Sequence, residues 1–183
     1  MSASRTGGGR GEAGFTLIDL LFVIAMIGLL STLAIPGLMR ARGAAQSASA
    51  VGTVKVVNSA QLSFAITCGL GFYAPDFPTL GVRPPSSVDA FLGPELSAGP
   101  TFIKSGYQFR MGVIPLGGTP GSCNGVAPGQ MSSGYAIVAD PLDLGGKWKF
   151  LGSNADGTLW QHNATFASIM PQTGSPSAGE PLK

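Results

Sequence analysis

The sequence predicts an α+β fold in which one long, bent N-terminal helix packs, through its second half, on a small antiparallel β-sheet. Three observations predict this fold. Residues 15–35 form a continuous apolar run, a helical pattern continues to residue 67, and the strand-like segments all come after residue 105. The first half of the helix is therefore expected to cross a membrane.

The composition argues against several classes of protein. Only 11% of the 183 residues are charged, against roughly 25% in an ordinary soluble domain. The formal net charge of +2 is too small for a nucleic-acid-binding protein, which carries a clustered basic face. Two cysteines exclude a four-cysteine zinc site, and a single histidine argues against most histidine-based catalysis. We therefore expect no enzyme activity, no cofactor, no metal site and no nucleic-acid partner.

The apolar run from Phe15 to Ile35 reads FTLIDLLFVIAMIGLLSTLAI. At about 1.5 Å per residue, a helix of this length spans the roughly 30 Å hydrocarbon core of a bilayer. Because the run is apolar on every side, it cannot be an amphipathic surface helix, although a fully buried helix of a soluble protein stays open. A secretory signal peptide is the other alternative, but its apolar region has about 7–15 residues and ends at a small-residue cleavage site.

Asp19 is the only charged residue in this run. A carboxylate inside a membrane helix costs on the order of 2.5–3.5 kcal/mol, and less near the helix end, where it can reach the interface. The run contains no Lys or Arg that could pair with it. A free α-amine would become available if the chain were cut just before the run.

The sequence Gly14-Phe15-Thr16-Leu17-Ile18-Asp19-Leu20-Leu21 resembles the N-terminal signal of the type IV pilin and type II secretion pseudopilin superfamily. The resemblance extends through VIAMIGLLSTLAIPG and covers about residues 11–42. It implies cleavage between Gly14 and Phe15 by a prepilin peptidase, N-methylation of Phe15, and a pilin-like fold. It also implies that Asp19, where the family usually has Glu, pairs with the N-terminal amine of a neighbouring subunit during assembly.

The resemblance therefore predicts a structural subunit of a type IV pilus or pilus-like filament. Its partners would be identical or homologous pilin subunits, the prepilin peptidase and the inner-membrane assembly platform. The chain would cross the bacterial inner membrane once, with its C-terminal domain on the exported side, and then enter a pilus or a periplasmic pseudopilus. The alternatives are a pseudopilin of the type II secretion system and a membrane-tethered binding module that does not polymerise.

The remaining elements are expected in the order helix, loop, sheet and tail. Pro36 lacks a backbone donor and should kink the helix, and one helical face carries Val51, Val54, Asn58, Leu62 and Ala65. Strands are expected at 107–111, 134–139, 148–151 and 158–161, with residues 154–157 as a hairpin turn. The predicted segments are a cleaved leader at 1–14, a membrane half-helix at 15–35, an amphipathic half-helix at 36–68, a Gly/Pro-rich loop at 69–104, the sheet at 105–166 and a flexible tail at 167–183.

Two further sets of residues are candidates for bonds or ligands. Because the resemblance places the C-terminal domain outside the cytoplasm, a disulfide between Cys68 and Cys123 is permitted there, and we expect it over two unpaired thiols. The oxygens of Asp140, Asp143, Asn154 and Asp156 could bind calcium, but their spacing matches no calcium-binding loop, and turns next to Gly and Pro already explain them.

Overall fold

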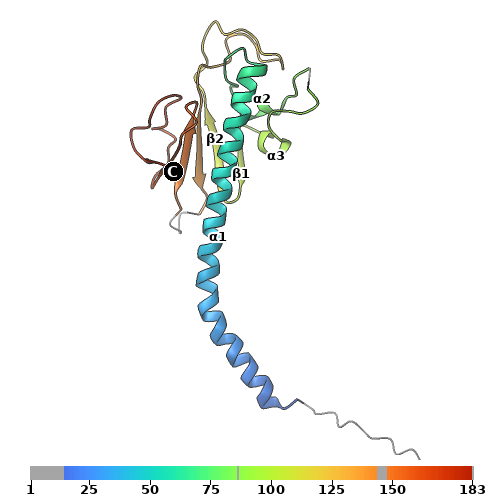
Figure 1. The fold of residues 1–183 in the computed structure, drawn as a ribbon, viewed down its shortest axis with the longest axis vertical. Coiled ribbons are helices and arrows are strands. Elements are labelled where there is room, and N and C mark those ends of the chain that lie inside the picture. Colours follow the sequence, from blue (N-terminus) through green and yellow to red (C-terminus); the bar gives the residue numbers. More distant parts are fainter. Residues whose placement is uncertain (1–14, 86, 144–147, 183) are drawn as a thin grey trace, which may run out of the picture. The chain divides into compact units, whose positions relative to one another are not determined.

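The computed structural model describes residues 15–85, 87–143 and 148–182, and the chain divides into two compact units, Met1–Ala41 and Arg42–Lys183 (Figure 1). The α+β class is confirmed. The helices are α1 (Leu17–Thr67), α2 (Phe77–Gly81) and α3 (Pro94–Ser97), and the strands are β1 (Thr101–Lys104), β2 (Tyr107–Gly112), β3 (Ala136–Pro141), β4 (Phe150–Asn154), β5 (Leu159–His162) and β6 (Glu180–Pro181).

The helix α1 continues through Pro36, which lies inside it. In the first unit its hydroxyl side chains are satisfied locally, since Ser31 Oγ donates to the carbonyl of Ile27 at 2.8 Å and Thr32 Oγ1 donates to the carbonyl of Leu29 at 2.7 Å. Such bonds remove the cost of placing a hydroxyl in an apolar environment. The kink at Pro36 stays a prediction.

The six strands form one antiparallel sheet in the order β1-β2-β3-β4-β5-β6, so each strand pairs with its neighbour in sequence. A two-residue turn joins β1 to β2, in which Ser105 and Gly106 both have positive φ, 51° and 78°. Positive φ at both central residues is typical of the hairpin turn that matches the twist of the strands.

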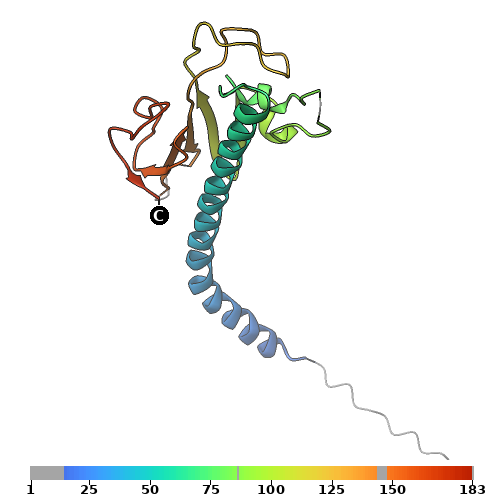
Figure 2. The ribbon, with the colours of Figure 1, turned by 45° about the horizontal axis from the view of Figure 1, so that its top comes forward.

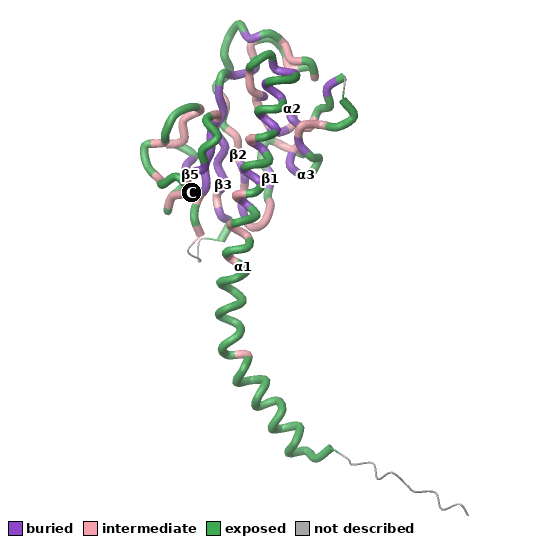
Figure 3. The backbone as a smooth tube through the Cα atoms, in the orientation of Figure 1, coloured by how far each residue is buried: buried purple, intermediate pink, exposed green. Residues whose placement is uncertain are grey.

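The core lies between the second half of α1 and one face of the sheet (Figures 1 and 3). The helix contributes the buried residues Ala50, Thr53, Val54, Val57, Ala60, Gln61, Phe64 and Ala65. The sheet contributes Tyr107, Phe109, Ile137 and Leu151, all 1% exposed or less. Leu62, expected on the inner face, is 54% exposed, so the buried face is rotated from the expected one.

A polar network crosses this interface and fixes the helix against the later strands. Asn58 donates its amide to Ser153 Oγ at 2.8 Å and accepts a bond from the Tyr135 hydroxyl at 3.2 Å. Burial raises the pKa of the Tyr135 phenol, because the phenolate would lose its hydration. Asn58 therefore belongs to the packed face as a hydrogen-bonding residue, as its spacing predicted.

The segment expected to be a Gly/Pro-rich loop contains regular structure. Both α2 and α3 have a proline in their first turn, where the missing N–H costs nothing. Asp76 caps α2 by accepting from the backbone N–H of Thr79 at 2.8 Å. The loop prediction is also wrong for β1, since residues 101–104 pair with β2. Figures 1 and 2 show α2 and α3 on the β1 side of α1.

The C-terminal segment is packed, contrary to the expected flexible tail. Phe166 is fully buried against the sheet face opposite α1, next to Gly152. The Asn154 amide donates to the carbonyls of Pro171 at 3.2 Å and Gly174 at 2.6 Å. The chain then returns as β6, which pairs with β5. The tail is therefore ordered by a side chain from β4, a contact that its Pro/Gly/Ser composition does not reveal.

Candidate functional site

The apolar half of α1 is exposed in the described chain. Of residues 15–35, only Ser31 is partly buried, and the most apolar window of α1 has a mean hydropathy of 2.5 with none of it buried. The structure therefore does not show the fully buried soluble helix that the composition alone left open. Among the described residues, α1 is the one helix long and apolar enough to cross a membrane. An exposed apolar surface of this size indicates a lipid or protein partner.

The start of this helix is a reciprocal cap between Thr16 and Asp19. Thr16 precedes the first helical residue, and its hydroxyl accepts from the Asp19 backbone N–H at 3.3 Å. In return, Asp19 Oδ2 accepts from the Thr16 backbone N–H at 3.2 Å and from the Thr16 hydroxyl at 2.5 Å. This arrangement satisfies donors that would otherwise be unpaired at a helix N-terminus. Asp19 therefore has a local role in its own chain.

This cap was missed in the interpretation of the sequence, although the signal was there. Thr16 and Asp19 have the Thr-x-x-acidic spacing that marks a helix start before an apolar run. The cap locates the first turn of α1 directly after the predicted cleavage position. Phe15 lies just ahead of the helix and is 86% exposed. Gly14 and the expected leader lie outside the described residues.

Asp19 has no basic partner among the described residues, as the absence of Lys and Arg from the apolar run predicted. The ion pairs among the described residues join Lys104 to Glu95, and Arg110 to Asp140, so neither involves Asp19. Within the described part of the chain, the carboxylate is held by neutral donors from Thr16. Both of these bonds end on Oδ2, and a carboxylate offers about four lone-pair positions, so the cap leaves capacity for a cation.

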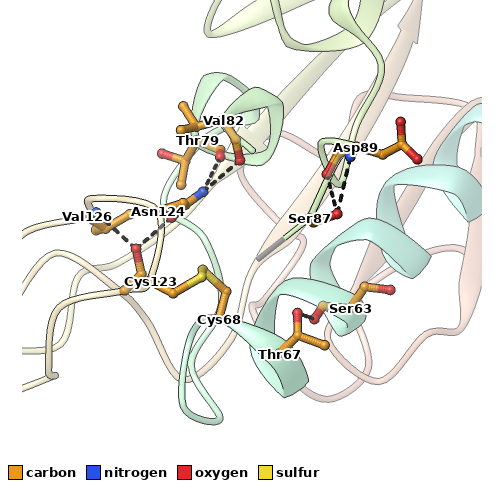
Figure 4. The surroundings of a disulfide bond; sticks show 11 residues. Ser63, Thr67, Cys68, Thr79, Val82, Ser87, Asp89, Cys123, Asn124 and Val126 are labelled. Atoms are coloured by element: carbon orange, nitrogen blue, oxygen red, sulfur yellow. Dashed lines mark hydrogen bonds between the residues drawn. A yellow bond between two sulfur atoms is a disulfide. The ribbon is translucent and has the colours of Figure 1, made fainter. Parts of the chain in front are cut away.

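A disulfide between Cys68 and Cys123 fastens the end of α1 to the long connection between β2 and β3 (Figure 4). The two Cα atoms lie 4.9 Å apart, and the Cys123 backbone N–H donates to the Cys68 carbonyl at 3.1 Å. The next residue, Asn124, donates its amide to the carbonyls of Thr79 at 2.9 Å and Val82 at 3.1 Å. The bond expected from the sequence is therefore part of a clip that also holds the end of α2.

Three of the four side chains considered for calcium, those of Asp140, Asn154 and Asp156, bond other groups of the protein through their oxygens. Asp140 pairs with Arg110 and accepts from the Thr165 hydroxyl at 2.8 Å. Asp156 Oδ2 accepts from the Gly174 backbone N–H at 2.7 Å, and Asn154 Oδ1 accepts from the Asp156 backbone N–H at 3.2 Å. The described residues contain no group of three or more His, Cys, Asp or Glu side chains placed to hold a metal ion.

The site is therefore an exposed apolar half-helix that begins with a capped carboxylate, in a chain whose second unit is closed by a disulfide. No protein-family model, curated protein or solved structure matches the chain.

Proposed function

We propose that this chain is a structural subunit of a type IV pilus or pilus-like filament. It would insert in the bacterial inner membrane as a prepilin, be cleaved after Gly14, be N-methylated on Phe15, and polymerise through the N-terminal half of α1. The observation that carries the proposal is the exposed apolar run of α1, which begins at a carboxylate just behind the Gly14-Phe15 motif. A pseudopilin of the type II secretion system would use the same features and is the nearest alternative.

The exposed run needs an apolar environment in two successive states. Lipid surrounds it before assembly, and the helices of neighbouring subunits would surround it afterwards. Lipid tails are as apolar as leucine, so the hydrophobic effect contributes little to helix association inside the bilayer. Side-chain packing and specific polar contacts then select the partner and the axial position. Asp19 is the one charged residue available in the run for such a contact.

Cleavage after Gly14 would create the complementary charge. The new α-amine of Phe15 lies one residue ahead of the cap formed by Thr16 and Asp19. In a bundle of staggered helices, the amine of one subunit can approach the carboxylate of the next. Each charge then compensates the other in a low-dielectric environment, where removal of one partner costs about 3–5 kcal/mol. Because the pair is specific in position, it also fixes the axial stagger of the helices.

Substitutions at Asp19 test this proposal, because they separate capping from charge. Asp19→Asn keeps an oxygen that can cap the helix but removes the charge, so incorporation into filaments should fall by about a hundredfold or more. Asp19→Glu keeps both properties and should be tolerated. Incorporation is measured as the amount of subunit in sheared filaments relative to the amount in the membrane.

Thr16→Val is the matched control, since it removes the capping hydroxyl and leaves the carboxylate. The loss of a cap costs about 0.5–2 kcal/mol of helix stability and leaves the charge available for pairing, so this variant should still assemble. If Asp19→Asn enters filaments as well as the parent protein, the pairing is wrong. If the parent protein stays in the membrane and forms no filament with its assembly machinery present, the chain is a tethered module.

A further inference from the structure

Two adjacent residues, Cys123 and Asn124, attach the long connection between β2 and β3 to the rest of the second unit. Among the described residues, the disulfide and the hydrogen bonds that join residues 113–131 to other parts of this unit all start at these two residues. The remaining hydrogen bonds of the connection lie within it, such as those from the Gly129 backbone N–H to Thr119. The disulfide is therefore the covalent part of a two-residue attachment.

The Asn124 side chain is fixed by three hydrogen bonds (Figure 4). Its amide nitrogen donates to the carbonyls of Thr79 at 2.9 Å and Val82 at 3.1 Å, and its Oδ1 accepts from the Ser122 hydroxyl at 2.7 Å. The next backbone N–H along the chain, that of Gly125, donates to the Ser122 carbonyl at 3.3 Å. The carboxamide and the backbone nitrogen that follows it are therefore both held by other groups.

Asn124-Gly125 is the one Asn-Gly pair in the sequence, since the other asparagines precede Ser or Ala. Asparagine is thermolabile, because the backbone nitrogen of the next residue can attack the side-chain Cγ. A succinimide ring forms, and the proton of that nitrogen leaves with the side-chain NH₂ as ammonia. Water then opens the ring at either carbonyl and gives aspartate or isoaspartate. Glycine favours the attack, since it has no Cβ to hinder the approach.

The fold opposes this reaction while the disulfide is closed. Ring closure requires the Asn124 Cγ to move onto the Gly125 nitrogen, which the bonds from the amide to Thr79 and Val82 prevent. Gly125 itself is exposed, and apart from its chain neighbours no atom of the described chain lies within 4 Å of the position that its Cβ would occupy. Water and space for the ring are therefore present, and the hydrogen bonds of Asn124 restrain the reaction.

We propose that the Cys68–Cys123 disulfide protects Asn124 from deamidation, and that reduction of the disulfide makes Asn124 a site where aspartate and isoaspartate form. The reductant is a thiol: two thiol molecules are oxidised to their own disulfide, and the two cysteines are reduced. Cys123 is the exposed member of the pair, whereas Cys68 is 3% exposed. Without the cross-link, the connection is held by hydrogen bonds and apolar contacts alone, so it opens more often.

Deamidation makes the loss of this attachment irreversible. An aspartate at position 124 has no side-chain N–H, so the carbonyls of Thr79 and Val82 lose their donor and face a negative charge instead. Reoxidation of the two cysteines restores the disulfide but not these contacts. Because all of these residues lie in the second unit, the chain keeps a covalent record of having been reduced whether or not it enters a filament.

The test measures the deamidation of Asn124 in the full chain in detergent micelles at mildly alkaline pH, by peptide mass spectrometry that separates aspartate from isoaspartate. Three samples are compared: the folded protein with the disulfide closed, the same oxidised protein in urea, and the folded protein kept reduced by a thiol. Asn124 should deamidate at least about tenfold faster in the second and third samples than in the first. Asn163, which is exposed and precedes Ala, is the internal control, and reduction should leave its rate unchanged.

Two variants separate the disulfide from other causes. The double variant Cys68→Ser with Cys123→Ser removes the bond without added thiol and should match the reduced sample. Gly152→Ala weakens packing on the sheet face opposite α1 and keeps the disulfide, so its Asn124 should deamidate at the parent rate. Equal rates in the first and third samples would overturn the inference. Loss of the helical circular dichroism on reduction would also overturn it, because deamidation would then report unfolding of the whole unit.

A second measurement tests whether the change is irreversible. Asn124→Asp with the disulfide closed reproduces one product of the reaction, and its equilibrium constant for unfolding should rise at least about tenfold, because two carbonyls lose their donor. Asn163→Asp is the matched control, since the Asn163 oxygen accepts from the Lys149 ammonium group and a carboxylate keeps that bond. This control should unfold at the parent urea concentration. An Asn124→Asp variant as stable as the parent would contradict the irreversible loss.

Discussion

Gln61 attaches α1 to the segment that follows it by hydrogen bonds to a buried backbone residue. Its side chain is fully buried and pairs with the backbone of Ala74 in both directions. Gln61 Nε2 donates to the Ala74 carbonyl at 3.0 Å, and the Ala74 backbone N–H donates to Gln61 Oε1 at 2.9 Å. The Gln61 amide thus bonds both backbone groups of buried Ala74, as a neighbouring strand would do in a sheet.

Substitution of Gln61 by Leu should therefore destabilise the protein strongly although it keeps the size of the side chain. Two buried backbone groups of Ala74 lose their partner, and each unsatisfied group costs about 1–3 kcal/mol, which gives about 2–6 kcal/mol in total. The free energy of unfolding of the full chain, measured by urea denaturation in detergent micelles, checks this value.

Leu62→Gln is the matched control, because it exchanges the same two residue types at the neighbouring position of α1. Leu62 is 54% exposed, so this change should stay within about 0.5 kcal/mol of the parent, as surface substitutions usually do. If Gln61→Leu unfolds at the same urea concentration as the parent, the amide does not hold Ala74, and the interpretation of this interface is wrong.

Two other changes should affect the second unit. Reduction of Cys68–Cys123, or replacement of both residues by Ser, should lower the free energy of unfolding by about 4 kcal/mol, and two freely alkylatable thiols in protein from the cell envelope would refute the bond. Gly152→Ala should lower the free energy of unfolding by about 1–3 kcal/mol through overpacking, since the added Cβ would lie 2.9 Å from the ring of buried Phe166. An unchanged unfolding midpoint would show that the C-terminal segment moves aside with no loss of stability.

The long helix was predictable because its signal is local and strong. The apolar run, the helical pattern up to residue 67 and the stop at Cys68-Gly69 all lie within one stretch of sequence. The register of its buried face was not predictable in the same way. Gln61 is polar and yet buried, and Leu62 is apolar and yet exposed. Gln61 can be buried because its amide pairs with the backbone of Ala74, a contact that the spacing of apolar residues does not reveal.

Strands were predictable where apolar and polar side chains alternate along the sequence. They were missed where the strand conformation depends on pairing with another strand. Tyr107 to Met111 alternates apolar and polar side chains and forms β2. In contrast, β1 follows a stretch rich in Gly and Pro, and its strand conformation comes from pairing with β2 across a two-residue turn. Glu180 and Pro181 form β6 only because the C-terminal segment packs on the sheet and returns to β5.

The candidate site also has features that the sequence predicted and contacts that it did not. Asp19 was identified as an isolated charge in an apolar run, but its bond to Thr16 depends on where the helix begins. The Cys68–Cys123 bond was expected, whereas the support from Asn124 was not, because that contact joins residues more than 40 positions apart.

The central claim is that the chain is processed as a prepilin, and the N-terminus of the native protein tests it most directly. Intact and peptide mass spectrometry of the protein from its own membrane and filament fractions reports cleavage and methylation together. We predict a chain that begins at N-methylated Phe15 and lacks residues 1–14. A native N-terminus at Met1, or one beyond Ile35 as a secretory signal peptidase would leave it, would contradict the claim.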